Sequence, residues 1–184
     1  MATQDDEDNG EDRVIYHPNQ DKASSKATKA IVVLLLLVSA GLTALITIGG
    51  WKNLQGAKVV SVIFVIVYLV MAFYVARWVR GVLPLAAGLA IVLGVFAAIA
   101  SFGAGSWFDR DHTGYDQTGI PPTLIGMLTV ILLPVLLLLI AFSMRAFAQK
   151  WNIEIEMDRD EYEREYGSGR QGGGGYGQAQ PAQG

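Results

Sequence analysis

The chain has no cysteine, and ionisable residues are missing from four long stretches of it. Without cysteine there can be no disulfide bond, thiolate metal site or thiol redox chemistry. The stretches without Asp, Glu, Lys or Arg are residues 30–51, 59–76, 81–108 and 117–144. Because about 20 helical residues cross a bilayer core about 30 Å thick, each stretch is long enough to span a membrane. Their apolar runs are continuous rather than alternating, which disfavours a membrane β-barrel.

These stretches predict an all-α membrane protein, with four transmembrane helices in an up-and-down bundle and polar, disordered termini. The expected transmembrane domain covers residues 30–148, and short connections between the helices favour antiparallel neighbours. The four spans are expected at about residues 30–50, 59–76, 83–104 and 121–147.

Both ends of the chain are polar and rich in acidic residues. Residues 1–29 are predicted to be an acidic disordered tail, since they contain too little apolar surface to fold. Residues 149–166 form a charged juxtamembrane segment, and residues 167–184 a flexible tail rich in Gly and Gln. Within the charged segment, apolar and acidic residues alternate over 152–158, as in a strand, whereas the residues that follow favour a helix. The sequence leaves these two alternatives open.

The third span carries small residues at near-helical spacing, which would allow other helices to pack closely. Packing within the bundle is preferred over a dimer face because the small residues wrap around more than one side of the helix. Pro134, near the middle of the fourth span, is expected to kink that helix. The candidate packing residues are Ala87, Ala90, Gly94, Ala97, Ala98 and Ser101.

The longest loop between spans is the only one between spans that contains a cluster of carboxylates. Its pattern resembles the first half of a calcium-binding loop but has Ile120 where the bidentate Glu would stand. The simpler interpretation is a solvated turn, with Trp107, Phe108 and Tyr115 as anchors at the membrane interface. Its candidate metal ligands are Asp109, Asp111, His112 and Asp116.

The four uncharged stretches contain no Asp, Glu, His, Lys or Arg that could act as an intramembrane acid or base. Proton relays and coupled transporters place such residues inside their spans. Haem held between helices needs paired histidines, but His17 and His112 lie outside the spans. We therefore expect no catalytic residue, no cofactor and no enzymatic activity. The hydroxyl groups in the spans are expected to bond to carbonyls of their own or neighbouring helices.

Basic residues near the ends of the spans are unevenly distributed, which predicts the orientation of the chain. They favour both termini in the cytoplasm. The spans rich in Val, Ala and Gly and the tail rich in Gly and Gln favour a plasma membrane location, as in a bacterial inner membrane. Nucleic acid is not an expected partner because the chain has no basic face. The proposed cytoplasmic side has Lys22, Lys26, Lys29, Arg77, Arg80, Arg145 and Lys150, against Lys52, Lys58 and Arg110 on the other side.

The four-span layout is shared by unrelated proteins and does not define a function. The leading hypothesis is a non-catalytic membrane anchor, scaffold or accessory subunit that binds a protein partner through residues 150–184 or the outer loop 105–120. The alternative is a small transporter or channel that acts as a homo-oligomer. A third hypothesis, an enzyme that acts on lipid through Asp109, Asp111 and His112, has the least support.

Overall fold

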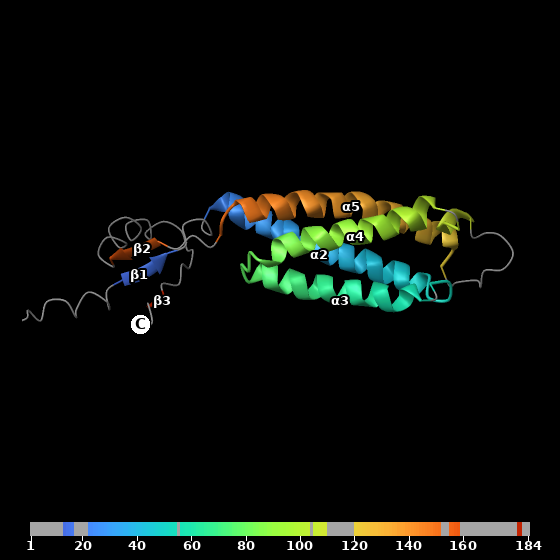
Figure 1. Ribbon diagram of the computed structural model, residues 1–184, viewed down its shortest axis with the longest axis horizontal. Coiled ribbons are helices and arrows are strands. Elements are labelled where there is room, and N and C mark those ends of the chain that lie inside the picture. Colours follow the sequence, from blue (N-terminus) through green and yellow to red (C-terminus); the bar gives the residue numbers. More distant parts are fainter. Residues whose placement is uncertain are drawn as a thin grey trace, which may run out of the picture. The chain divides into compact units, whose positions relative to one another are not determined.

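A computed structural model of the chain divides into two compact units, Lys26–Gln149 and the two chain ends, Met1–Ser25 with Lys150–Gly184 (Figure 1). Each unit is considered by itself below. The structure describes residues 13–16, 22–54, 56–103, 105–109, 120–151, 155–158 and 180–181.

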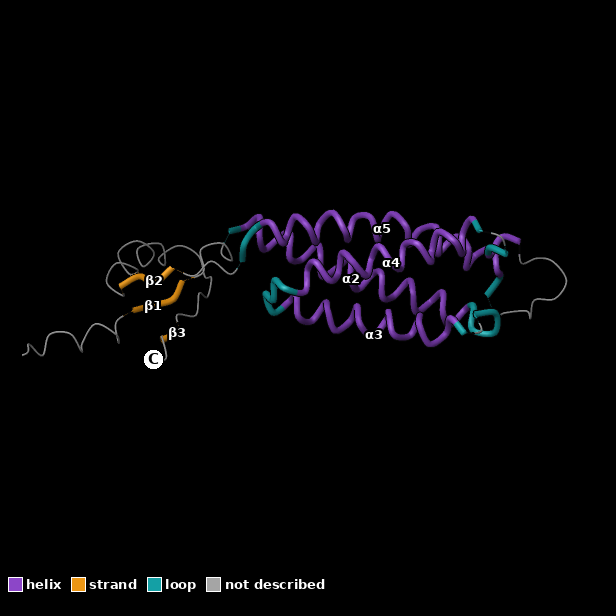
Figure 2. Tube along the Cα trace, in the orientation of Figure 1, coloured by secondary structure: helices purple, strands orange, loops and turns teal. Residues whose placement is uncertain are grey.

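The larger unit is built from four helices, joined by short turns where the connections are described (Figure 2). All four are long and apolar enough to cross a membrane. Their many β-branched residues do not prevent helix formation, because a segment in lipid has to satisfy its backbone hydrogen bonds internally. The helices are α2 (Ala23–Gly49), α3 (Ala57–Ala76), α4 (Val82–Phe102) and α5 (Pro122–Ala148), with a 3-10 turn, η2 (Trp107–Asp109), between the last two.

The first helix extends beyond its predicted span. It begins at Ala23 rather than at residue 30, so residues 23–29 belong to α2 and not to a disordered tail. The segment Ala23–Lys29 contains Ala and Lys, which favour helix in water, and the backbone N–H of Ser25 already bonds to the carbonyl of Lys22 at 3.0 Å. Low apolar content therefore did not prevent this segment from continuing the helix outward.

Helix α5 runs from Pro122 to Ala148 with Pro134 inside it. Proline removes one backbone hydrogen bond, but the surrounding residues keep the helix continuous through this position. The predicted kink at Pro134 stays a prediction.

Helices α4 and α5 pack against each other through small and branched side chains. On α4 the buried positions recur every three or four residues, as expected for one face of a helix. Of the six predicted packing residues, Gly94 and Ala98 are half-buried. The other four, Ala87, Ala90, Ala97 and Ser101, are buried within this chain.

The smaller unit contains a three-stranded sheet of order β2-β1-β3, from strands β1 (Arg13–Tyr16), β2 (Ile155–Asp158) and β3 (Gln180–Pro181). Strand β1 pairs antiparallel with both neighbours. The register places Val14 opposite Met157 and Arg13 opposite Asp158.

This sheet differs from the disordered tail that the sequence predicts over residues 1–29, because residues 13–16 pair with residues 155–158. It also answers the question that the sequence left open, since residues 155–158 are a strand. Sequence alone could not show this, because β1 and β2 lie at opposite ends of the chain and the stability of a short strand depends on its partner.

Candidate functional site

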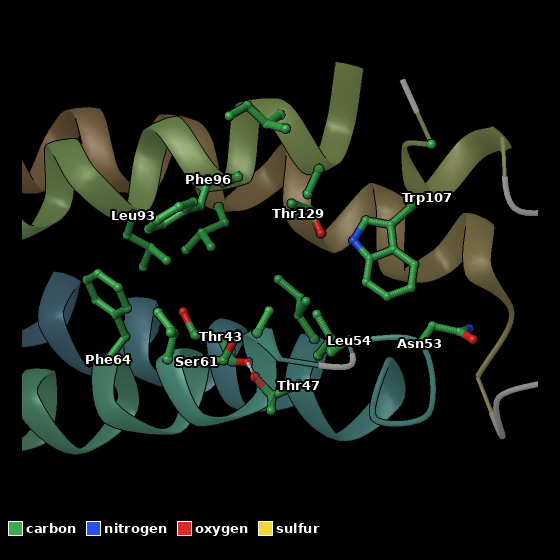
Figure 3. A pocket seen from close by; sticks show the side chains of 18 residues that line it. Thr43, Thr47, Asn53, Leu54, Ser61, Phe64, Leu93, Phe96, Trp107 and Thr129 are labelled. Atoms are coloured by element: carbon green, nitrogen blue, oxygen red, sulfur yellow. Dashed lines mark hydrogen bonds between the residues drawn. The ribbon is translucent and has the colours of Figure 1, made fainter. Parts of the chain in front are cut away.

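A cavity of about 390 Å³ lies among the four helices, near the end where α2 stops and α3 begins (Figure 3). Every helix contributes to its wall, and Trp107 of η2 and the turn after α2 complete it. Its size falls in the range of small-molecule sites, roughly 300–1,000 Å³.

One half of the cavity is apolar. Phe64 of α3 and Leu93 and Phe96 of α4 surround it (Figure 3). No acidic or basic side chain lines the cavity among the described residues. This half therefore suits hydrocarbon rather than a charged or strongly hydrated group.

Polar side chains line the rest of the wall, from Thr43 and Ser61 near its middle to Asn53 at the end where Trp107 lies (Figure 3). The threonine hydroxyls of the wall donate to their own helix. Thr47 Oγ1 donates to the carbonyl of Thr43 at 2.6 Å, and Thr129 Oγ1 to that of Ile125 at 2.8 Å.

A third cavity-lining hydroxyl behaves in the same way, since Thr43 Oγ1 donates to the carbonyl of Ser39 at 2.7 Å. These contacts confirm the expected bonding for all three threonines. Their hydrogens are used within the helix, so their oxygens face the cavity as weak acceptors.

Aromatic rings packed on glycines close the polar end. The Trp107 ring lies so close to Gly50 that a Cβ there would overlap it. At Gly126 a Cβ would lie 2.9 Å from Cζ of Phe108. Trp107 is 2% exposed, so the prediction that it anchors the chain at the membrane interface is wrong. It packs inside the bundle because Gly50 leaves room for its ring.

The cavity opens sideways between α3 and α4. Val60 of α3 and Phe96 and Ile99 of α4 line it and are 44%, 52% and 59% exposed. Side chains that face both the cavity and the outside form its rim. On a membrane-spanning helix this outside would be lipid.

The predicted acidic loop is described only in part. Asp109 ends η2 and is exposed. The other candidates, Asp111, His112 and Asp116, lie outside the described residues. Among those that are described, no group of three or more His, Cys, Asp or Glu side chains could hold a metal ion. The metal hypothesis for this loop stays a prediction.

Basic residues join the helix ends at the opposite end of the bundle. Lys29 Nζ donates to the carbonyl of Ala76 at 3.3 Å and lies 4.0 Å from the centre of the Trp78 ring. Arg80 Nε donates to the carbonyl of Phe147 at 2.9 Å, with its guanidinium carbon 4.2 Å from that residue's ring centre. These cations satisfy carbonyls at the C-terminal ends of α3 and α5.

Trp78 has a backbone conformation that the sequence did not reveal. Its φ is 65°, in the left-handed region that favours glycine. Its N–H bonds to the carbonyl of Val75 at 3.0 Å, and the N–H of Val79 bonds to that of Tyr74 at 3.1 Å. This is the Schellman arrangement that ends many helices, with tryptophan in the usual position of glycine.

Four buried hydroxyls differ from the threonines. They have no hydrogen-bond partner among the described residues. Leaving such a group unpaired costs about 1–3 kcal/mol, so each one marks a place where the interior is polar. Each helix contributes one of them: Ser39, Tyr68, Ser101 and Ser143.

Comparisons with known proteins assign the chain to no family. No family model matches it, and no curated protein or solved structure matches it significantly. The function must therefore be argued from the site and the arrangement of the helices themselves.

Proposed function

We propose that the chain is a multi-pass integral protein of a plasma membrane, as in a bacterial inner membrane, with its four helices in an up-and-down bundle. Support comes from contacts between helix ends. Lys29 near the start of α2 reaches the end of α3, and Arg80 before α4 reaches the end of α5. Gly50 after α2 meets Trp107 after α4. Such contacts suit neighbours that run in alternating directions.

Within that membrane the protein acts as a non-catalytic anchor or accessory subunit, whose joined chain ends bind a protein partner. The observation that carries this proposal is the pairing of β1 with β2. These strands flank the four helices in sequence, so both must lie on one side of the membrane if they pair. Basic residues at the same helix ends favour the cytoplasm for that side. The sheet would then be a cytoplasmic surface held at the membrane.

Co-purification in mild detergent tests the proposal. The full chain should retain partners that are lost when residues 150–184 are deleted. A second variant, Met157→Pro, should also lose them, because proline inside the four-residue strand β2 disrupts its pairing with β1. If the deletion and the proline variant both retain the same partners as the full chain, the docking proposal is wrong.

A reporter fused after Gly184 tests the orientation separately. It should be active as a cytoplasmic reporter and silent as an extracytoplasmic one. The opposite pattern would overturn the orientation whatever the partner experiment gave.

A second candidate function is a small transporter or channel that works as a homo-oligomer. Two observations favour it, the cavity among the helices and the buried hydroxyls without partners among the described residues. Solute flux into liposomes that contain the purified protein would test it. Flux that falls in Tyr68→Phe, with insertion unchanged, would favour transport over anchoring.

A further inference from the structure

We propose that the cavity holds one acyl chain of a membrane phospholipid, which enters sideways between α3 and α4. The proposal rests on the membrane location proposed above. The chain would lie along Phe64, Leu93 and Phe96, and its glycerol end would lie toward Asn53 and Trp107.

The composition of the walls favours a hydrocarbon chain over water. Apolar cavities stay dry in soluble proteins, because water needs two to four polar partners, and the part of this cavity around Phe64, Leu93 and Phe96 is apolar. Three hydroxyls on the cavity wall donate to their own helices. A strongly hydrated solute would therefore lose more hydrogen bonds on entry than the cavity returns.

The rim indicates where the occupant comes from. Because Val60, Phe96 and Ile99 are exposed on α3 and α4, the opening faces the same surroundings as the outer faces of these helices. In a bilayer those surroundings are lipid chains. No transfer through water is needed, and an acyl chain that fills the space restores the packing contacts that an empty cavity lacks.

The order of groups along the cavity matches that of a phospholipid. Phe64, Leu93 and Phe96 lie toward the middle of the helices, and Asn53 and Trp107 lie near their ends (Figure 3). Lys58 follows Ala57 of the cavity wall, and its Nζ lies 5.3 Å from the ring centre of Trp51. A lysine and an aromatic residue beside the polar end suit a phosphate headgroup at the membrane interface.

Fluorescence quenching in nanodiscs tests the proposal. The probe is phosphatidylcholine brominated in its acyl chains. The quenching due to Trp107 is the part of the fluorescence quenching that the wild type shows and Trp107→Phe does not. Filling the cavity with Ala100→Phe should remove most of this quenching. The matched control Val92→Phe, on the exposed face of the same helix and away from the cavity, should keep it.

A second filling variant, Ser61→Phe on α3, guards against misfolding of the first, and circular dichroism confirms that each is helical. Equal quenching in the wild type and in both filling variants would overturn the proposal. Stronger quenching of Trp107 by acrylamide from water than by brominated lipid would also overturn it, since the cavity would then be aqueous. Failure of the membrane proposal itself would look different, because alkaline carbonate would then extract the protein from membranes.

Discussion

The two ends of the four-helix unit are closed by different physical means. At the basic end, defined by Lys29, Trp78, Arg80 and Phe147, cations donate to backbone carbonyls and lie over aromatic rings. At the aromatic end, defined by Gly50, Trp107, Phe108 and Gly126, rings pack directly onto glycine backbone.

This difference predicts how each end responds to change. A cation on a long side chain reaches its carbonyl through several rotatable bonds, so the basic end can absorb small shifts of the backbone. A ring against a glycine has no such freedom, because any Cβ enters the space of the ring. We therefore expect the aromatic end to be sensitive to added volume, and the basic end to be sensitive to lost hydrogen bonds.

The largest expected effect is at the aromatic end. Gly50→Leu should lower the free energy of unfolding by about 3 kcal/mol, because the new side chain displaces Trp107. Gly41→Leu is the matched control, since Gly41 is exposed on α2 with no atom near its Cβ position. Unfolding by SDS titration in mixed micelles measures both. Equal losses at the two positions would contradict the packing of Trp107 on Gly50.

At the basic end, Arg80→Ala should lower the free energy of unfolding by about 2 kcal/mol, because it removes a charged hydrogen bond to the Phe147 carbonyl. Arg77→Ala should change it much less, since Arg77 is exposed and its guanidinium carbon lies 4.9 Å from the ring centre of Phe73. The same titration compares them. The interpretation would fail if Arg77→Ala proved the more damaging.

Substitutions of Trp78 can separate the effect of its left-handed backbone from the effect of its ring contact with Lys29. Alanine and glycine both remove the ring and its contact with Lys29, but only glycine relieves the left-handed backbone. Trp78→Gly should therefore be more stable than Trp78→Ala by about 1 kcal/mol. Melting temperatures in detergent give the order, and a less stable glycine variant would argue against strain at this position.

The smallest effect is expected at Gly94, halfway between the two ends. A Cβ there would meet only Cδ1 of Leu136, at 3.9 Å, which is ordinary contact. Gly94→Ala should therefore raise the free energy of unfolding slightly, by about 0.5 kcal/mol, because alanine loses less backbone entropy than glycine inside a helix. Gly126→Ala provides the contrast, because its Cβ would press on Phe108. If Gly94→Ala were the worse of the two, α4 would pack more tightly there than the structure indicates.

The glycines show where reasoning from sequence stops. A row of small residues on the third span drew attention to Gly94, which has room for a methyl group. The close contacts lie instead at Gly50 and Gly126, which belong to no row. The spacing of small residues along one helix predicts which face of that helix can pack closely. It does not predict which residue of another segment packs against that face. The cavity was unpredictable for the same reason, because its wall takes residues from all four helices.

The sequence by itself determined the four long apolar helices, because a segment of that length without charge has one stable form in lipid. It also separated apolar helices from charged ends, which follows from composition alone. The tertiary structure decided that β1 pairs with β2, which lies near the other end of the sequence. It also decided that Trp107 is buried within the four-helix unit and that Trp78 adopts a left-handed backbone. Each of these depends on contacts between residues distant in sequence or on the geometry of a particular turn. Local propensity does not encode such contacts.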